Sequence, residues 1–359
     1  MTLNSQPDDS ALTWDAVIAT RNRPEALALS IPLLLKQTRL PQKIIVIDSS
    51  DDHAPIRQIV TECTQGWDGE VIVHQSGPGL PYQRNRGLEH VSADVVIFPD
   101  DDSLFYTDTA AEIMAIYEMD RAGIVAGVCG ISVHEAPEGS LPEGTYQMSR
   151  AHARDARTRL MRNRIEKKLS HLKPALYLGG LFKGRHPVPD WFDPERHSLV
   201  EYMTGFRMSF RTQAIKAREF DENLKGYGLD EDVEASLAVA RDGLLVGARR
   251  AQVYHHKNPS GRAGSFTMGA IAVLNRAYVI LKHTSDGALT PQQSQAARSR
   301  LRWFIRLKLL TELRYLRSAP GRARWRGAFA AARASRTLMR TPRAELGAAY
   351  SAAQDTLTS

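Results

Sequence analysis

Short apolar runs alternate with helically patterned segments over the first third of the chain. The runs are rich in β-branched residues and too short for helices, which predicts buried strands. They occupy residues 13–20, 43–48, 69–76 and 94–98. After the first run, Leu27, Ile31 and Leu34 recur at helical spacing. Apolar strands that alternate with helices predict a doubly wound α/β domain with right-handed crossovers.

The pattern continues less regularly towards the C terminus. Further elements are expected in this order: a helix at 108–120, a strand at 123–133, a strand and turn at 204–214, a turn and helix at 226–243, and a strand at 244–256. The segment 134–189 holds a basic helical piece between Gly/Pro-rich joints and is predicted to be an insertion near the ligand-binding edge of the sheet. We therefore expect a disordered N terminus (1–12), an α/β domain (13–268) and a helical extension (269–359).

Composition narrows the class of protein. The chain of 359 residues is 43% hydrophobic and 24% charged, which is ordinary for a soluble globular protein. Cys63 and Cys129 form neither a disulfide framework nor a metal-ligand pattern, so a reducing, cytoplasmic compartment is expected. The first residues lack the features of a signal peptide, and no apolar run is long enough to span a bilayer.

Positive charge is concentrated near the C terminus. Residues 298–343 contain 13 arginines and one lysine against a single acid, Glu312, and the remainder of the chain is acidic. In this region one predicted helix face carries Leu301, Ile305, Leu309, Leu313 and Leu316. Two interpretations stay open: an interfacial helix that binds an anionic membrane surface, or a lid or homodimer element that packs on the α/β domain. Nucleic-acid binding is a weaker third, because no recognisable binding module is present.

The strongest chemical signal is the acidic triplet Asp100, Asp101 and Asp102, which directly follows an apolar strand. The carboxyl ends of parallel strands are where open α/β sheets bind ligands. Carboxylate oxygens suit Mg²⁺ or Mn²⁺, and these cations commonly hold substrate phosphates. The alternative is an acidic loop or helix cap, since Asp is common in both.

Five segments occur in an order that resembles the family 2 glycosyltransferases, which are inverting enzymes of the GT-A fold. They are VIATRNRPEAL, VIDSSDD, YQRNRGLEH, DDDS and GLDEDVEASLAVARDG, and the resemblance covers residues 15–256. It implies a GT-A mixed α/β sheet and transfer of a sugar from a nucleotide-diphosphate donor, with UDP- or dTDP-sugars favoured. The implied acceptor is a hydroxyl of a glycan or lipid-linked molecule in cell-surface polysaccharide or glycolipid synthesis.

The resemblance also implies residue roles on the donor side. Asp102 would bind the cation, Mg²⁺ or Mn²⁺, and either His255 or His256 would be a further ligand, because strand alternation does not fix which one faces inward. The residues implied to contact the donor are Thr20, Arg21, Arg23, Asp48, Arg84, Asn85, Asp100 and Asp101. Helix capping, surface charges and surface histidines are the ordinary alternatives for these positions.

On the acceptor side, the resemblance implies that Asp232 takes the proton of the acceptor hydroxyl, with Glu231 as its rival. Acidic residues in a first helical turn also have a plain structural explanation. Gly205 and Arg207 would lie beside the acceptor or a phosphate. The family's small residues before the Arg-Asn pair are replaced here by residues 81–83, and the insertion at 134–189 leaves the acceptor unspecified.

Two other functions remain as alternatives. A sugar-phosphate nucleotidyltransferase shares the fold and the acidic site, but it requires a glycine-rich phosphate loop after the first strand, and ATRNRPEAL contains no glycine. A non-catalytic membrane- or nucleic-acid-binding protein with a vestigial site is the other. The favoured location is cytoplasmic or peripheral at the inner face of the plasma membrane.

Overall fold

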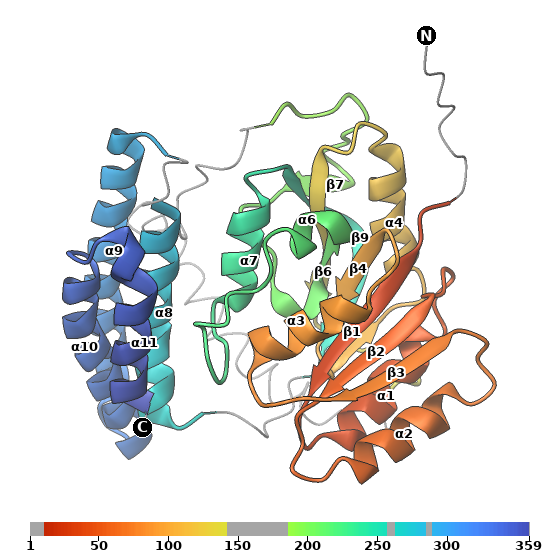
Figure 1. The fold of residues 1–359 in the computed structure, drawn as a ribbon, viewed down its shortest axis with the longest axis horizontal. Coiled ribbons are helices and arrows are strands. Elements are labelled where there is room, and N and C mark those ends of the chain that lie inside the picture. Colours follow the sequence, from red (N-terminus) through yellow and green to blue (C-terminus); the bar gives the residue numbers. More distant parts are fainter. Residues whose placement is uncertain (1–10, 142–185, 257–262, 285–288, 359) are drawn as a thin grey trace.

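The computed structural model describes residues 11–141, 186–256, 263–284 and 289–358 (Figure 1). The basic helical piece of the predicted insertion, most of that insertion and most of the predicted disordered N terminus lie outside the described residues.

One mixed sheet organises the α/β part of the molecule. Its strands are β1 (Trp14–Thr20), β2 (Lys43–Asp48), β3 (Glu70–Gln75), β4 (Val95–Phe98), β5 (Ser103–Phe105), β6 (Val125–Val133), β7 (His197–Leu199), β8 (Met208–Arg211) and β9 (Leu244–His255). The order across the sheet is β3-β2-β1-β4-β8-β6-β9-β5, with β7 paired to β9. Strands β1 to β4 are parallel, and β8 runs antiparallel between β4 and β6.

Most helices of this part lie where the sequence pattern predicts them, but the predicted strand and turn at 204–214 also contains a 3₁₀ turn and the start of a short helix. The helices are α1 (Pro24–Leu34), α2 (Ala54–Thr64), α3 (Leu80–His90), α4 (Thr109–Met119), α6 (Thr212–Lys216) and α7 (Glu231–Val239), with a 3₁₀ turn η1 (Gly205–Arg207). The sequence pattern did not predict β5 and β7. Each has three residues, too few to show a period, and each is held by pairing to β9.

Four C-terminal helices form a flank beside the sheet, with α8 nearest to it (Figure 1). They are α8 (Ser265–Thr284), α9 (Pro291–Glu312), α10 (Ala319–Leu338) and α11 (Arg343–Thr358), with a 3₁₀ turn η2 (Leu313–Tyr315) after α9. Leu274, Leu301 and Tyr350 belong to the same hydrophobic cluster as Phe210 and Leu237 of the α/β part. The extension is therefore packed on the domain.

The predicted apolar face of α9 is only partly buried. Leu301 and Ile305 lie in the core, but the helix ends at Glu312, so Leu313 falls in η2 and is 43% exposed. Among the described residues, no helix combines the length and the apolar character needed to cross a bilayer.

Candidate active site

Polar side chains from several elements meet at the carboxyl edge of the parallel strands. Thr20 and Asp48, the last residues of β1 and β2, are paired in register, and the acidic triplet follows β4 as a turn into β5. Strand ends are adjacent in a parallel sheet, so residues far apart in sequence are brought into one site.

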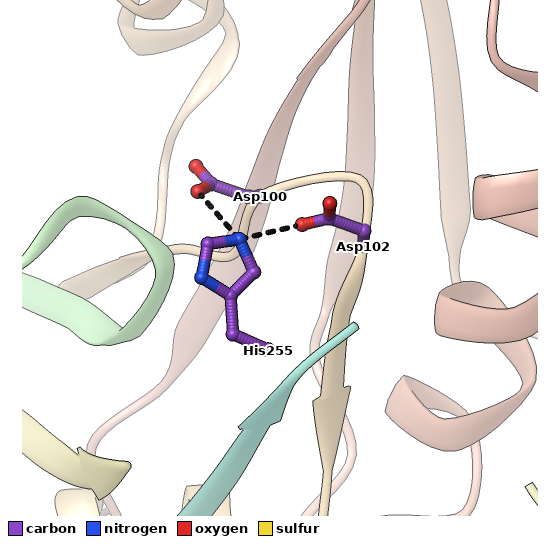
Figure 2. Close-up of side chains that lie close together, drawn as sticks. All are labelled: Asp100, Asp102 and His255. Atoms are coloured by element: carbon purple, nitrogen blue, oxygen red, sulfur yellow. Dashed lines mark ion pairs between the residues drawn. The ribbon is translucent and has the colours of Figure 1, made fainter. Parts of the chain in front are cut away.

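Asp100, Asp102 and His255 form a group with the chemistry of a divalent-cation site. His255 Nε2 lies 3.0 Å from Asp102 Oδ1 and 3.9 Å from Asp100 Oδ2 (Figure 2). One ligand atom from each residue lies within 4.8 Å of the others. Two carboxylates and an imidazole fit Mn²⁺ or Mg²⁺. The pairing of Ser103 with His255 between β5 and β9 fixes this arrangement.

The same pairing decides between the two histidines. The imidazole of His255 stacks on Phe206 with 4.5 Å between ring centroids, which orients it towards the carboxylates. His256 is absent from the ligand group among the described residues; its backbone N–H donates to the carbonyl of Asp102 at 3.0 Å. Of the two imidazoles, the structure therefore places that of His255 in the ligand group.

Asp101 has other partners than Asp100 and Asp102. It accepts a hydrogen bond from Thr20 Oγ1 at 2.9 Å and pairs with the Arg23 guanidinium at 3.1 Å. Burial raises the pKa of the Asp101 carboxyl to about 7, against the lowering effect of Arg23. Asp101 thus ties the acidic turn to the end of β1. Asp100 is a member of the ligand group, and its predicted contact with the donor stays a prediction.

Arg84 of α3 is a buried cation at the centre of the site. Its guanidinium pairs with Glu231 and, at 3.0 Å, with Asp100, and it lies over the ring of Phe220 at 5.5 Å. A Cβ at Gly205 would come within 3.1 Å of this guanidinium, so a larger residue there would press on it. Arg84 therefore links the acidic turn after β4 to the start of α7.

Asn85 has a different task from its neighbour. Its amide donates to the carbonyl of Phe220 at 2.9 Å and to Glu222 at 2.9 Å, and its oxygen accepts from the N–H of Phe220 at 2.8 Å. These bonds hold the loop after α6 that carries Phe220 under Arg84. The predicted contact between Asn85 and the donor stays a prediction.

The end of β2 holds a second polar group. Asp48 is buried, accepts a hydrogen bond from the backbone of Ser50 at 2.9 Å, and lies 2.6 Å from His53 Nδ1. Sequence reasoning did not single out His53, although its position shortly after an acidic strand end was a signal. Arg21 pairs with the exposed Asp51 at 3.2 Å, and its predicted contact with the donor stays a prediction.

Two neighbouring carboxyls at the start of α7 have different surroundings. Asp232 is partly exposed and accepts from the N–H of Gly205 and of Val233, both at 2.8 Å. Burial is the main cause that raises its pKa, to about 6. Glu231 is buried against Arg84, and burial raises its pKa to about 8 despite that arginine. Of the two, Asp232 is the available carboxylate.

Arg207, which was also predicted on the acceptor side, makes local contacts. Its guanidinium donates to the carbonyl of Gly130, lies 3.4 Å from Thr204 Oγ1, and stands over the ring of Phe206 at 5.5 Å. It therefore supports the ring that stacks on His255.

The loop before α7 is held by helix α8, which sequence reasoning missed. Asn275 donates to the carbonyl of Leu229 at 2.7 Å, and Arg276 pairs with Asp230 at 3.3 Å. Asp230 has a positive φ of 71°, a conformation that a non-glycine residue adopts at some cost. The signal in the sequence was that Asn275 and Arg276 interrupt an otherwise apolar run.

A parallel sheet joined to an antiparallel half, with an acidic turn and a histidine at its carboxyl edge, is the arrangement of the GT-A fold. Comparison with solved structures agrees. The crystal structure of residues 1–349 of TarS from S. aureus has a TM-score of 0.55 at 13% identity and covers 96% of this chain and 91% of its own. Mannosyltransferase PcManGT from Pyrobaculum calidifontis, solved with GDP-Man and Mn²⁺, has a TM-score of 0.50 at 14% identity and covers 98% and 90%.

Sequence comparisons support the family 2 resemblance over part of the chain. Residues 15–173 match the family model described as Glycosyl transferase family 2. The uncharacterized glycosyltransferase YwdF of Bacillus subtilis (strain 168) is 30% identical over 125 residues, which cover 34% of this chain and 44% of that relative. The chain thus spans less than half the length of this curated relative. These matches confirm the resemblance to family 2 glycosyltransferases; the family model covers β1 to β6 and does not reach Asp232 or His255.

Proposed function

We propose that this protein is an inverting, metal-dependent glycosyltransferase. It moves a sugar from a nucleotide-diphosphate donor to a hydroxyl of a glycan or lipid-linked acceptor in cell-surface polysaccharide or glycolipid synthesis. The observation that carries the proposal is the convergence of two sets of groups: the ligand group of Asp100, Asp102 and His255, and Asp232 beyond it, with Arg84 between them.

The donor would lie along the ends of β1 and β2. Thr20, Arg23 and Asp48 line that edge, and Asp48 with His53 would meet the nucleoside. TarS has been solved with UDP and with UDP-GlcNAc, whereas PcManGT was solved with GDP-Man, so the shared fold accommodates different nucleotides. We favour a UDP- or dTDP-sugar for this chain.

Asp100, Asp102 and His255 would hold the cation, which supplies Lewis-acid neutralisation of the diphosphate. The imidazole in this set favours Mn²⁺ over Mg²⁺, because Mg²⁺ prefers oxygen ligands. Arg84 keeps Asp100 in position and compensates the negative charge that the acidic turn places in a partly buried site.

Asp232 acts as the general base. The N–H groups of Gly205 and Val233 hold its carboxylate in one orientation, and its partial exposure allows an acceptor hydroxyl to approach. Asp232 removes the hydroxyl proton while the oxygen attacks the anomeric carbon from the face opposite the diphosphate, so the product has inverted configuration.

The test is an assay of nucleoside-diphosphate release and glycoside formation with a panel of UDP-, dTDP- and GDP-sugars. Asp232→Asn should lower kcat about 10²- to 10⁴-fold, while substitution of the exposed Asp355, which pairs with Lys225, by Asn should leave kcat unchanged. Full transfer by Asp232→Asn would refute the base assignment, and full transfer in excess EDTA would refute the metal role. Formation of a nucleotide sugar from a nucleoside triphosphate and a sugar phosphate would favour the nucleotidyltransferase alternative.

A further inference from the structure

Helix α10 carries arginines along one exposed face. Arg322, Arg326, Phe329, Arg333 and Arg336, here called the α10 stripe, follow the spacing i, i+4, i+7, i+11 and i+14, and all are exposed. The opposite face, with Gly327, Ala328 and Ala331, is buried. At 1.5 Å per residue the stripe is roughly 21 Å long. Arg340, just beyond the helix, is exposed as well.

The stripe has no acidic partners within the described part of the chain. None of its four arginines forms an ion pair there, and Arg322 donates only to the carbonyls of Leu316 and Arg317. The single acid of this region, Glu312, is buried between Lys308 and Arg324 at 2.8 and 3.2 Å. The positive charge of the stripe is therefore not compensated at the surface, which suits an extended anionic partner.

Large apolar side chains are exposed on α10 and on its neighbour α9. Phe329 lies within the stripe and is 43% exposed. On α9, Trp303 and Leu310 are 45% and 62% exposed and lie on one helix face with Arg302 and Arg306. Aromatic and aliphatic residues interleaved with arginines are the composition of helices that lie in a membrane interface.

We propose that α9 and α10 form a docking surface for an anionic phospholipid membrane. The exposed aliphatic Leu310 distinguishes this partner from a nucleic acid, because an aliphatic side chain gains free energy by entering the acyl boundary and can neither stack on a base nor pair with a phosphate. A membrane surface also matches the lipid-linked acceptor, and that part of the argument rests on the proposed function. The docking itself depends only on charge and exposed apolar area.

The experiment is flotation of the full chain with phosphatidylcholine vesicles, with and without phosphatidylglycerol, in the absence of donor. The chain should bind only the anionic vesicles, and less at high salt. The triple variant Arg326→Gln, Arg333→Gln, Arg336→Gln should bind on the order of 100-fold more weakly, because each basic residue near an anionic surface contributes about a factor of five.

The matched control removes the same charge from exposed positions on the sheet domain: Arg57→Gln, Arg121→Gln, Arg250→Gln. It should bind nearly as tightly as the wild type. A lysine version of the stripe keeps the charge and should retain binding, which separates electrostatics from misfolding. Trp303→Ala and Leu310→Ser should weaken binding at high salt more than at low salt, since they remove the apolar contribution.

The proposal would be overturned if the stripe and control variants lost vesicle binding equally. It would also be overturned if the wild type bound neutral and anionic vesicles equally. Binding to an unstructured RNA without binding to vesicles would make nucleic acid the partner and would also overturn it. Because flotation needs no turnover, failure here leaves the glycosyltransferase proposal standing, and an inactive enzyme that floats leaves the docking surface standing.

Discussion

At the scale of single residues, the structure separates side chains that the sequence presents as equivalents. Glu231 and Asp232 are adjacent acids, but Glu231 is buried against Arg84 and Asp232 is partly exposed. Asp100, Asp101 and Asp102 are likewise divided, because Asp101 turns to Thr20 and Arg23. Orientation within the turn, and not residue type, decides which carboxylates share the ligand group.

The pH dependence of transfer should report Asp232. A general base must be unprotonated to accept a proton. The pKa of the Asp232 carboxyl is raised to about 6. We expect kcat/KM to rise about tenfold per pH unit below pH 6 and to level off above it. Measurement of initial rates across this range checks the assignment. A rise in kcat/KM centred near pH 8 would instead indicate Glu231, whose pKa is raised to about 8.

Removal of the two histidine side chains should have unequal effects on cation binding. His255→Ala removes a proposed ligand and should lower the affinity for Mn²⁺ on the order of 100-fold, because even residues behind the ligands contribute 10- to 100-fold. His256→Ala should leave the affinity unchanged, because His256 contacts Asp102 through its backbone N–H. Calorimetric titration with Mn²⁺ measures both; equal losses would contradict the assignment of His255.

At the scale of elements, helix α8 supports the loop that leads to Asp232, the proposed base. Asn275 and Arg276 hold Leu229 and Asp230, while Lys282 pairs with Asp221 and with Glu234 of α7, both at 2.7 Å. Tyr350 of α11 donates to Asn275 at 2.8 Å and so connects a second helix to the same loop.

Substitution of Arg276 should impair turnover more than donor binding. Arg276→Gln leaves Asp230, which has a strained backbone, without its cation, so the start of α7 should shift. We expect kcat to fall about 10- to 100-fold, since small misplacements of a catalytic group have effects of this size. The KM for the donor should stay unchanged, because Arg276 lies away from the strand ends that would bind it.

Arg276→Lys keeps the charge and should restore part of kcat, a rescue that a purely structural role would not give. Asp355→Asn, which breaks the exposed pair between α11 and Lys225 of the same loop, is the control and should leave kcat unchanged. A rise in KM with constant kcat for Arg276→Gln would contradict the positioning role.

The crossing of α8 and α10 depends on two glycines. A Cβ at Gly327 would lie 2.0 Å from the carbonyl oxygen of Phe266, and one at Gly269 would lie 1.9 Å from that of Arg324. Gly327→Val must push backbones apart and should lower the free energy of unfolding by about 1–3 kcal/mol. Gly347→Ala in α11 meets only ordinary contacts and should raise it by up to about 1 kcal/mol. Urea denaturation measures both, and a neutral Gly327→Val would contradict the close crossing.

At the scale of the whole molecule, the sheet and the C-terminal helices share one hydrophobic cluster. Leu301 and Tyr350 of the extension belong to it together with Phe210 of β8 and Leu237 of α7. The two parts should therefore unfold together. Within the C-terminal helices, α8 holds the loop before α7, and α10 presents the exposed arginines of the α10 stripe.

Calorimetry should show a single unfolding transition for the full chain. Leu301→Ala leaves a cavity in the shared cluster and should lower the free energy of unfolding by about 2–5 kcal/mol. The single transition should move as a whole to lower temperature, because the sheet and the C-terminal helices would unfold together. Two separated transitions, with only the smaller one moved by Leu301→Ala, would show that the extension folds as an independent unit.

The parallel half of the sheet and its helices could be predicted because their evidence is local. Apolar runs of strand length, Pro24 at the start of α1 and the acidic strand ends follow from neighbouring residues alone. The family 2 resemblance followed from the order of short motifs. A strand near β8 was predicted, but its position between β4 and β6, and the short β5 and β7, could not be, because pairing between distant strands decides them.

By itself, the sequence determined the class of fold, the edge of the sheet that carries the site, and the residues that could act there. Tertiary structure decided which of them meet: Arg84 with Glu231, 147 residues apart, His255 with Asp102, and α8 with the loop before Asp232. The physical reason is the range of the determinants. Side-chain periodicity is set by local backbone geometry, whereas the facing of a side chain depends on strand register and helix packing, which are fixed only when the whole chain is folded.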